Sequence, residues 1–228
     1  MSIREDLLNL QDESYKAFHS KLTNTKYKII GVRLPNIKRM AKNLDLSLAF
    51  YYFDCLKSPF FEEIMLEGLC IGELKDINLV INRLDAFVNK IDDWSINDSL
   101  VSNLKITKKY KDIMWNYIIK YKNSDKEFEV RFMIVMMMSY YLDKKYIEDI
   151  FDIIDSITLD KYYVKMAIAW LLATSIVKCE KETIKYLENC KLDKYTFNKM
   201  ISKCNDSYRV RKDLKDLLKK MRKKYIND

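Results

Sequence analysis

Apolar residues recur at helical intervals along most of this chain. After Gly31, which marks a turn, Pro35 stands where a helix can begin. Four apolar residues then follow at positions i, i+3, i+4 and i+7, namely Ile37, Met40, Ala41 and Leu44. This spacing places them on one face of a helix that follows Pro35.

The same periodicity predicts helices over nearly the whole sequence. A first amphipathic segment runs from Leu7 to Leu22 and suits a single helix that ends near Thr23. The gaps between predicted helices are short, so we expect consecutive helices to pack as antiparallel neighbours. Further helices are predicted at 47–57, 60–74, 77–91, 94–105, 108–121, 127–141, 145–155, 160–177, 180–188, 194–204 and 210–225.

Composition favours an all-α protein. The 228 residues are 49% hydrophobic but include only 3 Gly and 2 Pro, too few for the tight turns of a β-rich fold. The most apolar stretch lies between Lys165 and Lys178 and is shorter than the roughly 20 residues of a membrane-spanning helix. The N-terminus lacks the pattern of a signal peptide. We therefore expect a cytoplasmic protein without a membrane partner.

Three landmarks recur at similar intervals. Trp94, Arg131 and Trp170 each lie in a strongly apolar helical segment, 37 and then 39 residues apart. This interval is close to the roughly 40-residue helix pair of HEAT-type solenoids. The sequence therefore favours a curved right-handed α-solenoid of HEAT-like helix pairs, and no linker divides residues 1–228, which we expect to form a single domain.

Few residues suit a metal or nucleophilic site. Five scattered cysteines without a Cys-x-x-Cys spacing indicate reduced thiols. The chain has one histidine, His19, which lies beside Phe18 and is interpreted as a surface or boundary residue. Glycine-rich phosphate loops are absent. We expect no metal, no cofactor and no nucleotide.

Positive charge is concentrated near the C-terminus. Residues 199–228 contain eleven Lys or Arg and four Asp, a net charge of +7 out of +8 for the whole chain. Such a helix can follow a phosphate backbone or an acidic membrane surface, or can simply be a solvated face.

Trp94 and Asp98 are four residues apart, so an indole and a carboxylate would lie one helical turn apart on one face. Alternatively, Asp92 or Asp93 caps the helix, Trp94 packs in the core and Asp98 is solvated.

Arg131 precedes seven apolar residues, Phe132 to Met138. A guanidinium there needs a partner, so Arg131 either forms a structural ion pair or binds a phosphate or carboxylate. Trp170 is a core residue or an exposed platform.

Taken together, several segments resemble the HEAT-repeat DNA alkylation-repair family, the AlkD-like DNA glycosylases, across nearly the whole chain. The segments that carry the resemblance are Gly31-Val-Arg33-Leu-Pro35 with Arg39, Glu63-Ile-Met-Leu-Glu67-Gly68, Trp94-x-x-x-Asp98, Glu129-Val-Arg131-Phe, Tyr162-Tyr-Val-Lys165-Met-Ala-x-Ala-Trp170, and Asn198-Lys199 ahead of Ser207-Tyr208-Arg209-Val210.

The resemblance implies roles for particular residues. It makes Asp98 the catalytic carboxylate, Trp94 and Trp170 the two lesion-side tryptophans, and Arg131 a DNA-backbone ligand. Further basic residues within the matching segments are candidate DNA contacts, namely Arg33, Lys165, Lys199 and Arg209. Ser95-Ile96-Asn97 before Asp98 departs from the family pattern, so the lesion range is expected to differ.

The implied function is base excision repair by a monomeric glycosylase that removes N3- or N7-alkylated purines from double-stranded DNA without base flipping. One alternative is a non-catalytic helical-repeat scaffold that binds nucleic acid or protein. Another is an RNA-binding protein, which would prefer single strands or A-form duplexes.

Overall fold

The computed structural model describes residues 2–227, and their side chains as far as residue 222. Within residues 2–227 the regular secondary structure is helical, and the only β-type pairing is an isolated bridge between Lys28 and Phe60. The all-α prediction is confirmed. The five cysteines are free thiols, four of them buried. No helix among these residues is both long enough and apolar enough to cross a membrane.

The helices follow the predicted order closely. Their bounds are α1 (Ile3–Asn9), α2 (Glu13–His19), α3 (Leu34–Asn43), α4 (Leu46–Asp54), α5 (Phe61–Glu73), α6 (Ile77–Phe87), η1 (Val88–Lys90), α7 (Trp94–Asn103), η2 (Lys105–Lys108), α8 (Lys111–Ile118), η3 (Ile119–Asn123), α9 (Glu127–Tyr140), α10 (Ile147–Ser156), α11 (Tyr162–Lys178), α12 (Glu180–Leu187), α13 (Lys194–Asp206) and α14 (Lys212–Asn227).

The single helix predicted between Leu7 and Leu22 is wrong. The chain forms two short helices there, because Asp12 adopts an extended backbone and its carboxylate accepts a hydrogen bond from the Tyr15 amide at 2.9 Å. This cap starts α2 anew. The backbone amide of Asp12 donates to the Gly31 carbonyl at 3.0 Å, which ties the break to the predicted turn.

Gly31 occupies the left-handed region with a φ of 100°. A Cβ at this position would come within 2.5 Å of the Lys16 Cβ, so the close approach of α2 also requires glycine. The buried carboxylate of Glu62 accepts hydrogen bonds from the backbone amides of Ile30, Gly31 and Val32. These bonds hold the segment that leads into α3, which begins around Pro35 as predicted.

Two other buried acids of α5, Glu63 and Glu67, pair with partly exposed cations. Glu63 accepts hydrogen bonds from Arg4 at 2.9 and 3.0 Å and from the Tyr52 hydroxyl. Burial opposes the charged form of Glu63, but these hydrogen bonds outweigh it and place its pKa below the usual value. Glu67 pairs with Lys90 at 2.7 Å. The matching segment that contains these acids therefore acts as a structural anchor.

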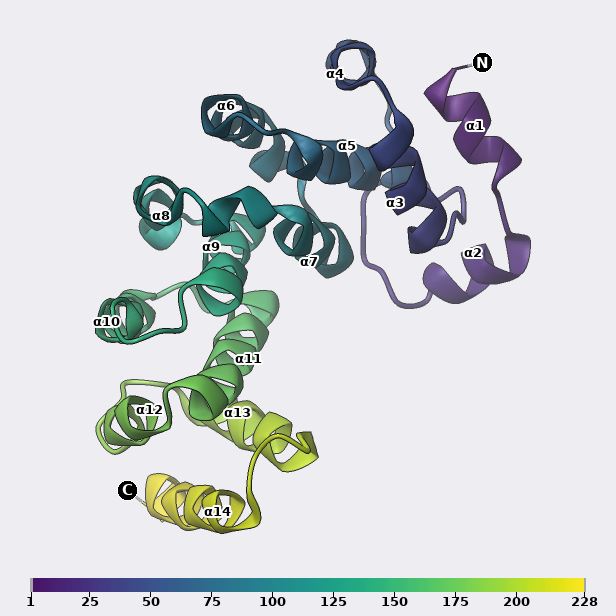
Figure 1. Ribbon diagram of the computed structural model, residues 1–228. Helices are drawn as coiled ribbons and strands as arrows, with labels where there is room; N and C mark the ends of the chain where they lie inside the picture. The colour runs from purple at the N-terminus through teal and green to yellow at the C-terminus, as the bar shows by residue number, and fades with distance from the viewer. Residues whose placement is uncertain (1, 228) are drawn as a thin grey trace. The chain divides into compact units, whose positions relative to one another are not determined.

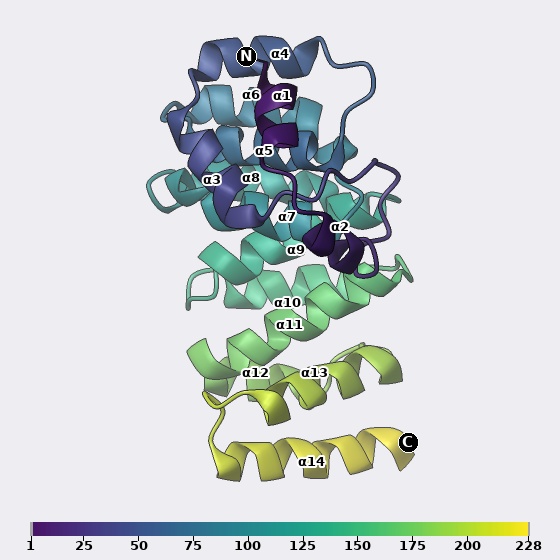
Figure 2. The same cartoon turned by 90° about the vertical axis from the view of Figure 1, so that its right-hand side faces the viewer.

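The chain divides into two compact units, Met1–Met114 and Trp115–Asp228, with the boundary inside α8. In the first unit α5 packs against α3 and α7, and α4 and α6 form a second layer (Figure 1). In the second unit α11 packs against α9 and α13, and α10 and α12 form a second layer beside these three helices. Figure 2 shows α11, α13 and α14 in succession.

Consecutive helices are in contact, as predicted, for example α11 with α12 and α13 with α14, and the most extensive packing joins alternate helices. This two-layer pattern is what stacked helix pairs produce within each unit. The curvature and handedness of a solenoid stay predictions, as does the single domain. Met133 and Met136 to Met138 are all buried in α9, where flexible methionine side chains fill space between the packed helices.

Candidate active site and nucleic-acid interface

Helix α7 presents Trp94 and Asp98 on one side of the first unit. Asp93 caps the helix, and its Oδ1 accepts hydrogen bonds from the Ser95 amide at 2.8 Å and the Ser95 hydroxyl at 2.6 Å. This confirms one of the two predicted caps. Trp94 is 39% exposed, so the alternative that it is wholly a core residue is wrong.

A buried amide holds the Asp98 carboxylate. Asn97 is fully buried, and its Nδ2 donates to Asp98 Oδ1 at 2.9 Å. Asn97 Oδ1 has no hydrogen-bond partner among the described residues. Asp98 itself is half-buried. Asn97 therefore orients the carboxylate from the core side of α7.

Asp98 and Trp94 border one cavity of about 350 Å³ in the first unit. Phe18 and His19 of α2 form another part of its wall, and α3 and α5 contribute further apolar side chains. Phe18 is 59% exposed. The lining is largely aromatic and aliphatic with a carboxylate at one side, a composition typical of small-molecule sites.

The prediction that His19 lies at the surface or boundary is wrong. Its ring stacks on Tyr15, with centroids 5.3 Å apart, and meets the edge of Phe61 at 5.0 Å. His19 is 9% exposed, and its Nδ1 has no hydrogen-bond partner within the described chain. Burial raises the pKa of nearby Asp93, while the Ser95 hydrogen bonds and the charge of His19 oppose this increase.

Arg33, a predicted DNA contact, is already paired in the first unit. Its guanidinium donates to Asp12 Oδ2 at 2.8 and 3.0 Å and lies 4.9 Å from the centre of the Tyr15 ring. Hydrogen bonds from Ser14, the Tyr15 amide and Arg33 hold the pKa of Asp12 below its usual value. Arg33 can reach a phosphate only by sharing or leaving this ion pair.

Arg131 is buried in α9 of the second unit, with 5% exposure. It donates from Nη1 to the Tyr163 carbonyl at 3.1 Å, and its guanidinium carbon lies 5.7 Å from the centre of the Tyr163 ring. The guanidinium therefore ties α9 to the first turn of α11. Arg131 thus has a structural role in this contact. Little of its side chain is exposed for binding to a DNA backbone.

Trp170 projects from α11 in the second unit. It is 38% exposed, whereas its neighbours Ala167, Ala169 and Ala173 are buried. The indole is therefore a partly open platform and not a core residue.

The remaining predicted cations differ in their partners. Lys165 pairs with Asp160 at 2.6 Å and lies 3.6 Å from Asp193, and the hydrogen bond with Asp160 contributes most to its raised pKa. Lys199 lies 5.3 Å from the centre of the Tyr195 ring. Arg209 is exposed in the segment between α13 and α14.

The prediction missed Lys203, one turn after Lys199 on α13. Burial lowers the pKa of Lys203, and the positive charges of Arg131 and Lys199 lower it further. The positive charges of Arg131 and Lys199 thus both act on Lys203, while the charge of Asp206 opposes them. This excess of positive charge favours an anion beside Lys203. The i, i+4 spacing of Lys199 and Lys203 is the sequence signal for this cluster.

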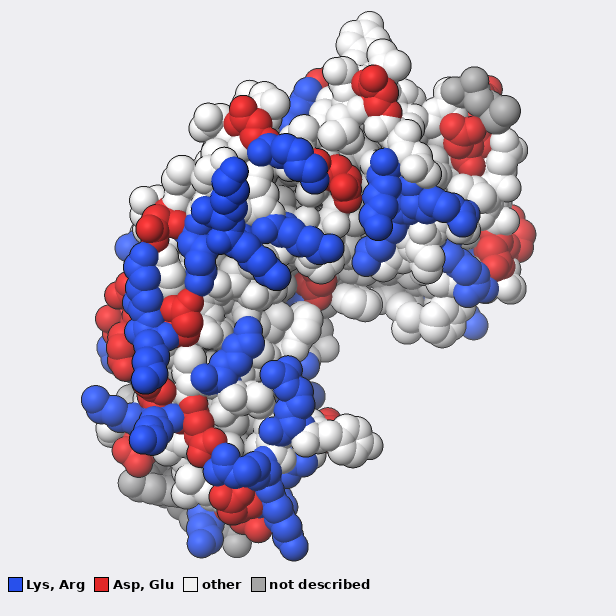
Figure 3. Space-filling view, viewed as in Figure 1, with Lys and Arg blue, Asp and Glu red and all other residues white. Residues whose placement is uncertain are grey.

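Figure 3 shows Lys and Arg side chains spread over the visible faces of both units, with acidic groups among them. The structure brings Trp94 and Asp98 together at one cavity in the first unit, and in the second unit Arg131 and Lys199 both lie within electrostatic range of Lys203.

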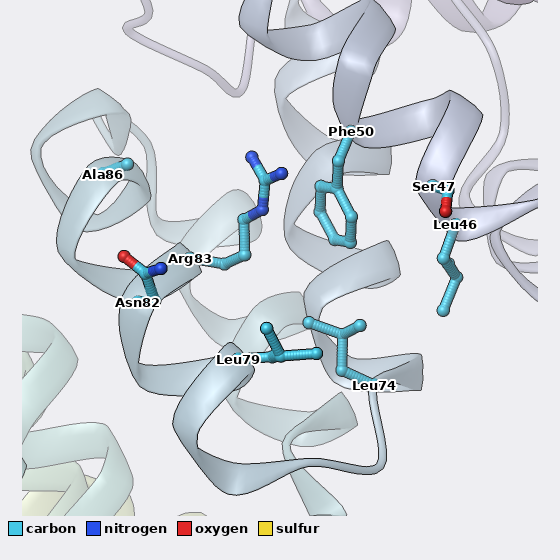
Figure 4. A pocket seen from close by; sticks show the side chains of 8 residues that line it. All are labelled: Leu46, Ser47, Phe50, Leu74, Leu79, Asn82, Arg83 and Ala86. Atoms are coloured by element: carbon cyan, nitrogen blue, oxygen red, sulfur yellow. The ribbon is translucent and has the colours of Figure 1, made fainter.

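A second cavity of about 580 Å³ lies between α4 and α6 (Figure 4). The Arg83 guanidinium lies 4.3 Å from the centre of the Phe50 ring and pairs with Asp54 at 2.8 Å. None of the candidate residues named above lines this cavity.

The helical chain thus places an indole and a carboxylate at one cavity of the first unit and cationic side chains on α9 and α13 of the second. The model of one family, described as DNA alkylation repair enzyme, matches residues 3–204 and runs through both units. The chain belongs to this family, as the sequence predicted, and is an enzyme of DNA repair that acts on DNA. Comparison with curated proteins finds no match.

Proposed function

We propose that the protein is a DNA glycosylase that removes cationic N3- and N7-alkylated purines from duplex DNA. The observation that carries the proposal is the shared cavity of Trp94 and Asp98 in a chain of the DNA alkylation repair family. A scaffold does not need a carboxylate beside an open indole on a protein that attracts phosphate.

The chemistry follows from the charge of the lesion. Alkylation at N3 or N7 makes the base cationic, so the electron pair of the C1′–N bond leaves with the base and neutralises it. The sugar becomes oxocarbenium-like, and the oxygen of a water molecule bonds to C1′. The ionised Asp98 stabilises this cation and orients the water, which loses its proton to the carboxylate or to solvent. The proposed reaction uses no metal.

The tryptophans act on the same charge. The open indole face of Trp94 attracts the sugar as positive charge develops. The resemblance gives Trp170 a corresponding role. Arg131 is proposed to bind a phosphate together with Lys199 and Lys203. Because Arg131 is mostly buried, the two lysines would make part of the contacts to this phosphate.

The base is proposed to stay stacked in the duplex, so the protein recognises the charge of the lesion and its weakened pairing. Neutral lesions would then be removed poorly. This mode of recognition is implied by the family resemblance. It differs from that of glycosylases that extrude the target base.

The test is the release of 7-methylguanine and 3-methyladenine from methylated duplex DNA in the presence of a chelator. Release above the spontaneous rate supports the glycosylase. Binding to the same duplex without release would favour the scaffold, and a preference for single strands or A-form duplexes would favour an RNA-binding protein.

A further inference from the structure

We propose that the cavity between α2, α3, α5 and α7 binds a free alkylated purine base. This inference rests on the proposed function, because it assigns a binding site to the base after its bond to the sugar has broken. The cavity borders Asp98 but extends away from α7 into walls that the proposed reaction does not use.

The cavity has the size of a small-molecule site. Its volume is about 350 Å³, within the roughly 300–1,000 Å³ typical of ligand pockets. The walls come from four separate elements of one compact unit. A single purine base therefore fits with room for an alkyl group.

Aromatic side chains on two elements suit a flat ligand. Phe18 from α2 and Trp94 from α7 both line the cavity and remain 59% and 39% exposed. Large apolar side chains left open around one hollow mark a binding surface. Bases bind to such faces by stacking, which tolerates different purines.

Several polar side chains line the cavity, including Lys38 and Ser99, and two others, Asp98 and His19, complement the edges of a purine. Asp98 borders the cavity and can accept a ring or amino N–H. His19 also lines it, and its Nδ1 is buried without a hydrogen-bond partner among residues 2–222. A purine edge offers both donors and acceptors, so it can pair with a His19 ring nitrogen in either tautomer once the ring turns that nitrogen toward the cavity.

Aliphatic side chains provide a place for the alkyl group. Leu22 and Met65 line the same cavity, and Leu22 is 51% exposed. Burial of one methyl group against them favours a methylated base over the unmodified base by about fourfold. The site should therefore bind 3-methyladenine more tightly than adenine.

The experiment is isothermal titration of the full-length protein, without DNA, with 3-methyladenine, 7-methylguanine, adenine and guanine. Saturable one-to-one binding is expected, with quenching of tryptophan fluorescence. Phe18→Ala should weaken binding about 5- to 100-fold through lost stacking. The matched control is Tyr51→Ala, an aromatic on α4 that is 73% exposed and lies outside the cavity.

Two further variants separate the contacts. His19→Phe keeps a ring in the wall and should weaken binding of all four bases, with thermal melting as a check on folding. Leu22→Ala should remove the preference for methylated bases and leave adenine binding nearly unchanged. The proposal is overturned if no base binds saturably, or if binding is the same in Phe18→Ala, His19→Phe and wild type.

The outcomes also distinguish this site from the proposed function. If the protein excises bases from DNA but binds no free base, the proposed base-binding site is wrong and the proposed glycosylase activity stands. If the protein binds the free base but excises nothing, the binding site stands and the glycosylase activity is wrong.

Discussion

Asn97 donates a hydrogen bond of 2.9 Å to Asp98 from a fully buried position, so the core of the first unit fixes the carboxylate that borders the cavity. A catalytic group must be held close to its productive position, and small displacements lower the rate strongly. Asn97 is therefore a positioning residue.

Asn97→Ala should lower kcat for excision about 10- to 100-fold, because Asp98 loses the bond that orients it. The KM for DNA should stay within about twofold, since Asn97 is buried. Single-turnover excision and a DNA titration measure the two quantities, and thermal melting checks folding. A change in KM alone would contradict the positioning role.

Lys203→Met should stabilise the free protein and weaken its binding to DNA. Burial, together with the charges of Arg131 and Lys199, lowers the pKa of Lys203, so the folded state holds its proton less tightly than the unfolded state and the charged form costs stability at neutral pH. This cost disappears as pH rises through the lowered pKa of Lys203 toward its usual value of 10.5.

Chemical denaturation and DNA titrations at several salt concentrations measure both effects. The salt slope should fall by about one in Lys203→Met. Lys185→Met on α12 is the matched control, because it removes the same charge from the other layer of the unit. Equal effects of the two substitutions would contradict a localised cluster.

Arg131→Ala should destabilise the protein by about 1.5 to 3 kcal/mol, since it removes the charged donor that ties α9 to the Tyr163 carbonyl. DNA binding should also weaken, with a shallower salt dependence. Arg131→Lys retains the charge and separates the two effects. If the salt slope of Arg131→Ala equals that of wild type, Arg131 has only the structural role.

Asp93→Asn should stabilise the protein at pH 7. Asparagine caps a helix about as well as aspartate, and the substitution removes a carboxylate whose pKa is raised by burial. The folded state binds that proton more tightly than the unfolded state, so wild type gains stability as pH falls through the raised pKa of Asp93 toward 3.8.

The difference between Asp93→Asn and wild type should therefore be largest at pH 7 and shrink on acidification. His19 and Asp92 also act on this carboxylate, so denaturation is measured at closely spaced pH values. A difference that is constant or grows as pH falls would contradict burial as the cause.

The helices, and the spacing of Trp94 and Asp98, could be predicted from sequence because both depend on neighbours within one or two turns. The break at Asp12 was missed, because a local cap outweighed a continuous apolar pattern. The cavity could not be predicted, since Phe18 and Trp94 come to line it only through tertiary packing. The burial of Arg131 likewise depends on how α11 packs on α9.

Release of 7-methylguanine from methylated duplex DNA by wild type and Asp98→Asn tests the central claim most directly. The matched control is Asp85→Asn, which removes an exposed carboxylate from α6 of the same unit. The proposed mechanism predicts a loss of at least about 100-fold for Asp98→Asn, with unchanged DNA binding and full activity for Asp85→Asn. Equal release rates for Asp98→Asn and wild type would contradict it.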